Sequence, residues 1–458
     1  MSTASTTVSE TPALRRSLGL PYAVLFGLAY MVPLTVFTTY GIVSTITSGH
    51  LALAYIITLT AMLVTALSYA RMVKALPVAG SAYTYTQRSF GPNLGFLVGW
   101  SLLLDYLFLP MINFMIIGLY LNAAIPALPA WLIIVAAIVI VTAMNVLGIK
   151  VAAGFNSMLV GIQVVFIVVF VIMSVVTLTA QDASIDPLAP FANEEFQFAA
   201  LIAGAAVLCL SFLGFDAVST LSEETKDPTR TIPRAILICT FSAGLIFIFL
   251  SWLGHLVFPD WTAYSSVDTA ATDVMARAGG AFLVAFFTAA FISGGAASAT
   301  ASHVSVTRIL YTMGRDGAMP GRIFAVLHPK FRTPYLAALA VGAVSLLALV
   351  LPLELAAAMI SFGALIAFTF VNLSVIKYHA VDRGRRHGGD LIRFVVLPAI
   401  GVTLCLWLWT SLSPDAFMVG LGWVGVGLVW LLVITRGLRR PAPTMDLQEV
   451  EDSVVPSS

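Results

Sequence analysis

Uncharged or nearly uncharged apolar runs of about 20 residues recur along this chain, and each is long enough to cross the hydrocarbon core of a bilayer. The 458 residues are 59% hydrophobic and only 10% charged, which is typical of a protein that has lipid as its solvent and not of a soluble enzyme. We expect an all-α membrane protein, because helices satisfy their own backbone hydrogen bonds inside lipid. The runs predict twelve transmembrane helices, at residues 20–47, 51–73, 94–122, 130–149, 155–180, 198–222, 234–258, 279–312, 334–351, 355–377, 392–412 and 416–435.

Lys and Arg are distributed unevenly between alternate loops. Of the 23 basic residues, all except Arg277 fall on one side of the predicted spans. Cytoplasmic loops retain positive charge, so we expect both termini in the cytoplasm and the loops near residues 186 and 265 outside. This describes a multi-pass protein of the inner, or plasma, membrane. Arg15 and Arg16 precede a long first run without a cleavage motif, so this run is expected to remain as a span.

Outside the spans, the chain has no segment long enough for a soluble module. The tails, 1–13 and 441–458, are rich in Ser, Thr and Pro and are expected to be disordered, which leaves 14–440 as one twelve-helix domain. Acidic residues in the longer external loops, 181–197 and 259–278, are interpreted as solvating those loops. A receptor or a membrane enzyme usually needs a soluble module, so transport is the favoured class. Neither enzymatic activity nor a nucleic-acid partner is expected.

Two predicted spans contain residues that break helices at mid-depth. Pro33 lies near the centre of the first span, in Met31-Val32-Pro33-Leu34-Thr35, and proline lacks an amide donor. Gly214 lies beside an acid in the sixth span, in Ser211-Phe-Leu-Gly214-Phe215-Asp216. The two interrupted spans are five apart, which is the offset expected for two five-helix inverted repeats that hold a substrate between discontinuous helices. Ordinary glycine and proline use in membrane helices is the alternative.

Two carboxylates are expected inside the membrane, where a charge costs about 2.5–3.5 kcal/mol on insertion scales. Asp105 lies near the middle of the third span and Asp216 in the broken sixth, and no Lys or Arg lies at comparable depth. Buried acids without a buried base favour a cationic partner, either a substrate amine, a proton or a metal ion. The alternative is a scaffold role in which hydroxyls and backbone amides satisfy each acid, and for His303 in the eighth span this alternative is preferred.

Other functional classes have weaker support. No convergent set of His, Cys or acidic ligands indicates a metal site, no filter sequence indicates a channel, and no cofactor is expected. Cys209, Cys239 and Cys405 all lie within predicted spans and are interpreted as packing residues. The eighth span is rich in hydroxyls and small residues, which favours close helix packing over an ion path. These residues are Ser293, Gly294, Gly295, Ser298, Thr300, Ser302 and Ser305.

With these residues in view, the chain resembles the amino acid-polyamine-organocation superfamily of secondary transporters, from about Arg15 to Arg440. The resemblance rests on the segment from Phe212 through Asp216 and Glu223-Glu224 to Pro233, and on Arg308 to Pro320. Residues 80–85, 103–113 and 361–372 are most similar to the bacterial putrescine importers. The resemblance implies a leucine-transporter-like fold, proton-driven import and a small primary-amine substrate.

The sequence departs from these relatives in three places. The turn in the first span lacks the glycines with which many amino-acid permeases receive a substrate carboxylate, which fits an amine without a carboxylate. Thr38 stands where the putrescine importers carry an acid, so an amino acid or a monoamine becomes more credible. Gln163 stands where proton-coupled relatives often place a lysine, which leaves Asp216 as the candidate for proton coupling.

The resulting hypothesis puts the substrate ammonium between the broken first and sixth spans. Its expected partners are the carbonyls of Met31 and Val32 and the carboxylate of Asp216, with Asp105 available to a second amine. Protonation of Asp216 and substrate binding would be linked, because both neutralise the same carboxylate. The alternatives are a permease for neutral or cationic amino acids and a non-transporting amine sensor. The predicted substrate-binding residues are Met31, Val32, Thr35, Asp105, Tyr106, Ser211, Gly214, Phe215 and Asp216, with Thr38 completing the polar lining.

Overall fold

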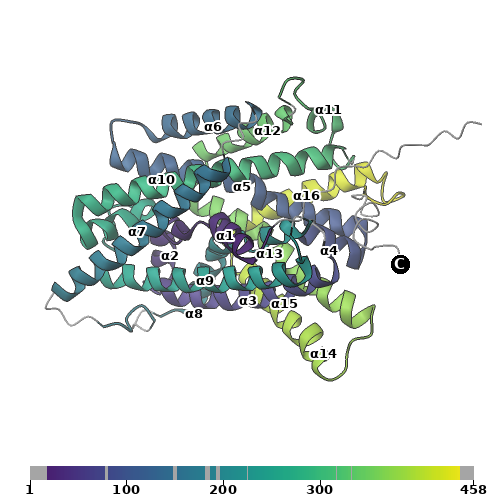
Figure 1. Ribbon diagram of the computed structural model, residues 1–458, viewed down its shortest axis with the longest axis horizontal. Helices are drawn as coiled ribbons and strands as arrows, with labels where there is room; N and C mark the ends of the chain where they lie inside the picture. Colours follow the sequence, from purple (N-terminus) through teal and green to yellow (C-terminus); the bar gives the residue numbers. More distant parts are fainter. Residues whose placement is uncertain are drawn as a thin grey trace, which may run out of the picture.

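The computed structural model describes residues 18–77, 81–147, 152–180, 186–191, 196–223, 225–315, 317–331 and 333–443. Apart from an isolated bridge between Leu18 and Thr225, these residues form only helices and loops. The predicted all-α class is therefore confirmed. Most of the long helices lie along one common direction, which is horizontal in Figure 1.

The described spans begin and end close to the predicted limits. Eleven segments are long and apolar enough to cross a membrane. The first half contains α1 (Leu20–Met31), η1 (Pro33–Phe37), α2 (Tyr40–Ile46), α3 (Leu51–Ala75), α4 (Ser81–Phe90), α5 (Pro92–Ala124), α6 (Ala130–Leu147), α7 (Ala152–Ala180), α8 (Phe198–Val207), η2 (Leu208–Phe212) and η3 (Ala217–Glu223). The second half contains α9 (Pro228–Val257), η4 (Val267–Thr269), α10 (Ala270–Arg315), α11 (Gly321–Phe324), α12 (Tyr335–Ser345), η5 (Leu346–Leu349), α13 (Leu353–Val375), η6 (Ile376–Val381), α14 (Gly389–Leu391), η7 (Ile392–Val396), α15 (Leu397–Thr410) and α16 (Pro414–Ile434).

The predicted ninth span, 334–351, differs from the others. It corresponds to α12 and η5, which together form an apolar helix over Tyr335–Leu349, shorter than the eleven spans. A total of twelve spans therefore stays a prediction. The helix ends follow local sequence signals, as at α16, where Ser413 caps the first turn by accepting a hydrogen bond from the amide of Ala416 and Pro414 occupies the first helical position.

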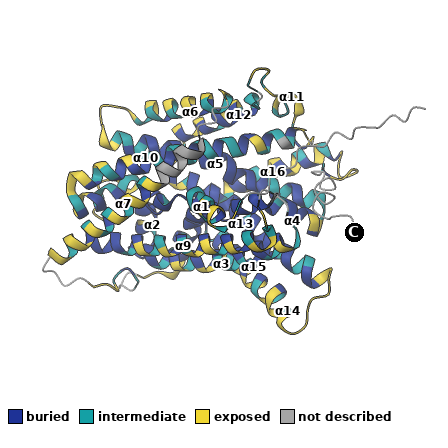
Figure 2. Cartoon of the chain, viewed as in Figure 1, coloured by how far each residue is buried: buried dark blue, intermediate teal, exposed yellow. Residues whose placement is uncertain are grey.

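Burial separates inner helices from outer ones. α5 and α13 pack against each other in the interior, and every residue of α5 from Trp100 to Gly118 is buried. By contrast, α6, α7, α15 and α16 expose large apolar side chains along much of their length (Figure 2). Because the outer surfaces are apolar, we expect lipid to cover them.

Two segments differ from the loops that the sequence predicts. Part of the predicted external loop 259–278 is helical, because α10 begins at Ala270 and buries one face there, with Ala271 and Met275 fully buried. The helix direction changes at Gly279 and Gly280, whose backbone angles are not helical. In addition, α4 is a separate amphipathic helix between the second and third spans, which the sequence reading did not anticipate.

Several predictions lie outside the described residues. These are the disorder expected for residues 1–13 and for most of 441–458, and the orientation signals of Arg15, Arg16, Lys150 and Arg332. Glu224 in the resemblance segment and the acidic residues Asp182, Glu194 and Glu195 also lie outside them. The sequence remains the only basis for what is expected of these residues.

Candidate substrate site at two broken helices

The first predicted span is interrupted at Val32, between α1 and η1. Val32 has φ 52° and ψ 99°, a conformation that β-branched residues rarely adopt, and Pro33 has no amide to continue the helical hydrogen bonding. Thr35 forms hydrogen bonds with two carbonyls near the break. Its hydroxyl donates to Met31 O at 2.7 Å, and its amide donates to Val32 O at 2.8 Å. The predicted interruption is confirmed, and both carbonyls predicted to meet the substrate already accept one hydrogen bond.

The sixth predicted span is interrupted at Leu213 and Gly214, between η2 and η3. Leu213 is extended, with ψ 129°, and Gly214 has φ 124°, which glycine adopts without steric cost. A Cβ atom at Gly214 would lie 2.7 Å from Cδ1 of Tyr30 and 3.1 Å from the amide nitrogen of Met31. The two breaks therefore contact each other directly, and glycine is required for that approach.

Asp216 lies immediately after the break and is 3% exposed. Its Oδ1 accepts a 3.2 Å hydrogen bond from the amide of Gly214. Its backbone carbonyl accepts hydrogen bonds from the hydroxyl of Ser219 at 2.6 Å and from the amide of Ser219 at 3.0 Å. A carboxylate has about four acceptor positions, so the bond from Gly214 leaves acceptor capacity for a further partner.

Asp105 lies on α5 and is 4% exposed. Asp105 interacts electrostatically with Asp216, and both acids interact electrostatically with the side chains of Tyr30, Tyr69 and Tyr106. Among the described residues, no Lys or Arg is buried. The structure thus brings the two predicted acids into one buried cluster surrounded by phenol groups, without a basic residue to balance them.

The remaining predicted site residues lie around this cluster, but several have structural partners. Ser211 shares a 3.0 Å hydrogen bond with the hydroxyl of Tyr55 on α3. Phe215 is fully buried, with Tyr69 and Phe368 rings at centroid distances of 5.5 Å and 5.2 Å. Tyr106 is 8% exposed. Phe215 and Ser211 therefore anchor the broken segment to neighbouring helices, whereas Tyr106 belongs to the acidic cluster.

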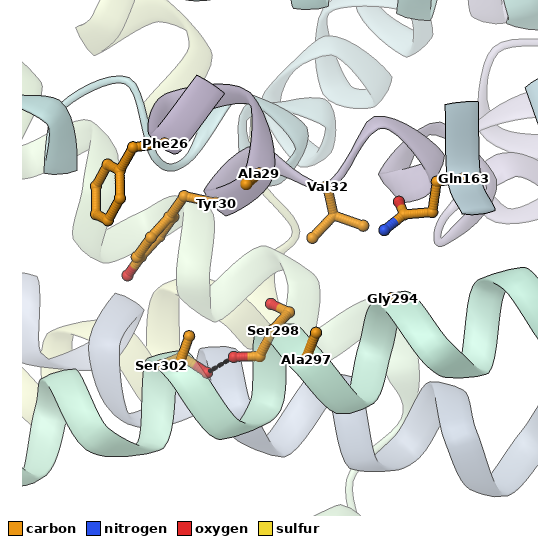
Figure 3. A pocket seen from close by; sticks show the side chains of 10 residues that line it. Phe26, Ala29, Tyr30, Val32, Gln163, Gly294, Ala297, Ser298 and Ser302 are labelled. Carbon is orange, nitrogen blue, oxygen red and sulfur yellow. Dashed lines mark hydrogen bonds between the residues drawn. The ribbon is translucent and has the colours of Figure 1, made fainter. Parts of the chain in front are cut away.

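A cavity of about 80 Å³ lies beside the break in the first span, between α1, α7 and α10. In Figure 3 the side chains of Ser298 and Ser302 on α10 face Tyr30 and Val32 across it, with Gln163 of α7 at one end. Val32 is the one predicted site residue among its lining side chains. Tyr30 connects the cavity with the acidic cluster, because it lines the first and interacts with both acids of the second. The lining residues are Phe26, Ala29, Tyr30, Val32, Gln163, Gly294, Ala297, Ser298, Ala301 and Ser302.

Polar groups in α10 mostly have local partners. Ser302 donates to the carbonyl of Ser298 at 2.6 Å, and the side-chain amide of Asn113 donates to Ser298 Oγ at 3.0 Å. His303 is fully buried, with Thr142 Oγ1 at 3.2 Å from Nε2 and Thr307 Oγ1 at 3.5 Å from Nδ1. These contacts agree with the expected packing role of His303. The three cysteines are buried and free.

Of the tyrosines around the acids, Tyr106 was predicted from the sequence, whereas Tyr30 and Tyr69 were missed. Tyr55 and Tyr69 are 14 residues apart on α3, close to four helical turns, and so share one face of that helix. This spacing indicates that the two tyrosines lie on the same face of α3. It does not indicate which neighbouring helix packs against that face. Tyr30 directly precedes the broken turn, so its position in the sequence could have suggested it.

Comparisons with known proteins identify the family of this chain. A family model described as amino acid permease matches residues 23–418. The chain is 43% identical, over 94% of its length and 96% of the relative's, to the low-affinity putrescine importer PlaP of Escherichia coli strain K12. It is 27% identical to the branched-chain amino acid permease BcaP of Bacillus subtilis, over 93% of this chain and 92% of that protein. It is also 27% identical to the methylthioribose transporter of Bacillus subtilis, over 93% of this chain and 95% of that protein.

These relatives differ in the molecules that their names specify, but all are membrane transport proteins of similar length. The family match covers both broken helices and both buried acids. The chain therefore belongs to the amino acid permease family of multi-pass membrane transporters.

Proposed function

We propose that this protein imports a small primary amine of the putrescine type and that a proton gradient drives the import. The observation that carries the proposal is the buried pair Asp105 and Asp216, which are 4% and 3% exposed, without a buried Lys or Arg among the described residues. Two neighbouring carboxylates repel each other and are costly to bury. A diamine brings two ammonium groups and would neutralise both.

The chemistry of the helix break supports an amine rather than an amino acid. A substrate carboxylate needs exposed backbone amides, but Pro33 has none and the amide of Thr35 donates to Val32 O. The carbonyls of Met31 and Val32 keep one lone pair each after their contacts with Thr35. This turn is therefore richer in acceptors than in donors, which suits an ammonium group.

The aromatic side chains near the acids suit the same ligand. Tyr30, Tyr69 and Tyr106 all interact electrostatically with both acids. An aromatic face attracts a cation by about 0.5–2 kcal/mol, and phenol hydroxyls can accept hydrogen bonds from an ammonium group. In this proposal the cavity beside Tyr30 and Val32 is the part of the substrate path next to the acids.

Proton coupling is assigned to Asp216. The amide of Gly214 bonds to Oδ1 at the break, so a change of charge on Asp216 acts directly on the segment that joins η2 to η3. A bound ammonium and a bound proton compete for this carboxylate, which links substrate occupancy to proton occupancy. Rocking of one helix bundle of the leucine-transporter-like repeat would then expose the site to each side in turn.

The relative at 43% identity is described as a putrescine importer, which supports the substrate class. A permease for neutral or cationic amino acids is the second candidate, because Thr38 near the break offers no carboxylate and BcaP is described as a branched-chain amino acid permease. The large excess of Lys and Arg on one side of the spans further supports a plasma-membrane protein with both termini in the cytoplasm.

The deciding experiment is uptake of labelled putrescine into proteoliposomes with a competition panel. Putrescine, spermidine, lysine, arginine, alanine and simple monoamines would each be tested as competitors. Competition by the amines with none by alanine supports the proposal, whereas strong competition by neutral amino acids favours the permease. Saturable binding without accumulation would instead indicate an amine sensor.

A further inference from the structure

The hairpin that joins α13 to α15 carries most of its charge in one sign. Between residues 376 and 396 the sequence has five Lys or Arg and two Asp. Figure 1 shows this hairpin, with α14 at its tip, projecting from the same end of the molecule as α4 and α11. The basic residues are Lys377, Arg383, Arg385, Arg386 and Arg393.

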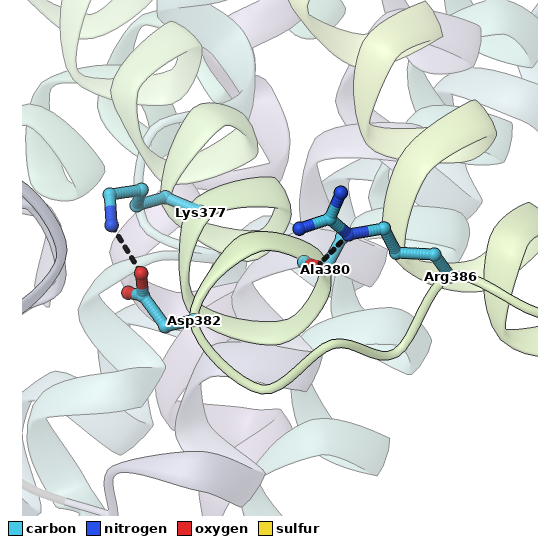
Figure 4. Close-up of polar contacts among 4 residues, drawn as sticks. All are labelled: Lys377, Ala380, Asp382 and Arg386. Atoms are coloured by element: carbon cyan, nitrogen blue, oxygen red, sulfur yellow. Dashed lines mark hydrogen bonds and ion pairs between the residues drawn. The ribbon is translucent and has the colours of Figure 1, made fainter.

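Three of these basic residues have partners within the hairpin. Lys377 forms an ion pair with Asp382, and Arg386 donates from Nε to the carbonyl of Ala380 at 2.6 Å (Figure 4). Arg383 lies over the ring of Tyr378, 4.3 Å from its centroid, and donates to its hydroxyl. These contacts hold the turn of the hairpin in its conformation. They engage Asp382, which is one of the two acids in the hairpin.

A second group of cations lacks such partners. Neither Arg385 nor Arg393 forms an ion pair with a described acid, and Cζ of Arg385 instead lies 5.7 Å from the ring centroid of Phe394. Arg71, from the cytoplasmic end predicted for α3, interacts electrostatically with Arg393, and its Nη1 is buried without a hydrogen-bond partner. Like charges are thus gathered here, and neither Arg385 nor Arg393 is balanced by an ion pair with a described acid.

His379 lies at the centre of this group. It is 6% exposed, and its ring stacks on Phe394 at 4.3 Å with an interplanar angle of 17°. Neither ring nitrogen has a hydrogen-bond partner, although one of them carries a proton in either tautomer. It interacts electrostatically with Arg71, Arg383 and Arg385, and with one acid, Asp390.

Buried donors without acceptors cost about 1–3 kcal/mol each, so a group that supplies oxygen acceptors and negative charge would stabilise this arrangement. The hairpin also exposes apolar side chains, namely Val381, Leu391, Ile392 and Val396, which are 49%, 43%, 57% and 42% exposed. Acyl chains can cover such residues while a headgroup meets the cations. A freely dissolved anion would leave them in water.

We propose that Arg71, His379, Arg385 and Arg393 form a binding site for the phosphate group of an anionic phospholipid. The site lies between the end of α3 and the hairpin, outside the acidic cluster, and it does not depend on the proposed substrate. A zwitterionic lipid offers the same phosphate but also a positive amine, which the surrounding arginines would repel. The site therefore selects a phosphodiester with net negative charge.

The test compares lipid retention by the purified full-length protein in native mass spectrometry, with phosphatidylglycerol and phosphatidylethanolamine as probes. The variant is Arg71→Gln with Arg393→Gln. The matched control is Arg322→Gln with Arg436→Gln, which removes the same charge from exposed positions. Each charge near an anionic lipid is worth about fivefold in affinity, so the site variant should lose roughly 25-fold in phosphatidylglycerol retention while the control keeps it.

Equal retention by the site variant and the control would overturn the proposal, as would equal retention of the two lipids by the unmodified protein. The phosphate group could come from a lipid headgroup or from a freely dissolved phosphate ion. Adding excess inorganic phosphate during delipidation distinguishes these two sources. Loss of bound lipid only at very high phosphate supports a lipid site, whereas full displacement by modest phosphate would refute the lipid assignment. If the double variant fails to fold, Arg393→Gln alone, at an exposed side chain, makes the same comparison with an expected loss of about fivefold.

Discussion

The amide of Gly214 donates a 3.2 Å hydrogen bond to Oδ1 of Asp216 across the break in the sixth span. The bond thus joins Gly214, whose φ is positive, to Asp216, the acid proposed to bind the substrate. Asp216 consequently has a structural role and a proposed electrostatic role, and these roles need different substitutions to separate them. Asparagine keeps an oxygen acceptor at this position, whereas alanine removes it.

Asp216→Asn is expected to fold and insert normally but to lose uptake. The side-chain carbonyl of asparagine can still accept from Gly214, so only the charge is removed. Losing a partly desolvated ion pair with an ammonium costs about 2–5 kcal/mol, which is well over tenfold in substrate affinity. The measurement is putrescine uptake at matched abundance, with Asp415→Asn at an exposed position of α16 as control. Uptake equal to that of the unmodified protein would leave Asp216 with only its structural role.

Asp105→Asn distinguishes a diamine from a monoamine substrate. The side chain of Asp105 forms no hydrogen bond with another described residue and interacts electrostatically with Asp216. If the second ammonium group reaches Asp105, the substitution should weaken putrescine binding by more than tenfold and leave a monoamine nearly unaffected. Competition constants for putrescine and butylamine measure this difference. Equal losses for both ligands would contradict contact with a second amine.

Gly214→Ala is expected to abolish uptake and to destabilise the protein. Alanine at φ 124° is strained, and its Cβ would lie 2.7 Å from Cδ1 of Tyr30. The backbone strain alone costs about 1–3 kcal/mol. Gly422→Ala on α16 is the matched control, because no heavy atom lies within 4 Å of a Cβ there, and it should be neutral or slightly stabilising. Thermal unfolding in detergent and uptake report the two effects, and a fully active Gly214→Ala protein would contradict close contact of the breaks.

Uptake is expected to follow the proton gradient and not the sodium gradient. In this proposal Asp216 is the group whose protonation alternates with substrate binding. An inwardly directed proton gradient in proteoliposomes should increase initial uptake, and a protonophore should abolish accumulation. Uptake that survives the protonophore but requires external sodium would reverse the assignment and direct attention to the hydroxyls of Ser298 and Ser302 beside the cavity.

The orientation of the chain can be tested by cysteine labelling. Cys209, Cys239 and Cys405 are buried and form no disulfide, so they can be replaced to give a cysteine-free background. Cysteines introduced at 186 or 265 should react with an impermeant reagent in intact cells, because these loops are predicted to lie outside. Cysteines at 228 or 325 should react only after lysis. Strong labelling of 228 or 325 in intact cells would overturn the topology.

The sequence by itself determined that this is an all-α membrane protein, where most spans begin and end, and that the first and sixth spans are interrupted. These features are local, because hydrocarbon imposes a fixed length on apolar helices and because Pro33 and Gly214 act on their own turns. Asp105 and Asp216 were also visible in the sequence, since a charge within an apolar run is rare. The helix α4 was not visible, because it lacks the length of a span. The ninth run was visible, but its helix, Tyr335–Leu349, is shorter than the predicted span.

Only the tertiary structure decided which groups meet. The contact of Gly214 with Met31, the pairing of Ser211 with Tyr55, and the gathering of tyrosines around the acids each join residues from different helices. Spacing along one helix shows which residues share a face but not the neighbour that the face meets. The rotation and packing of helices within the bundle set these contacts, and they depend on side chains from the whole chain at once.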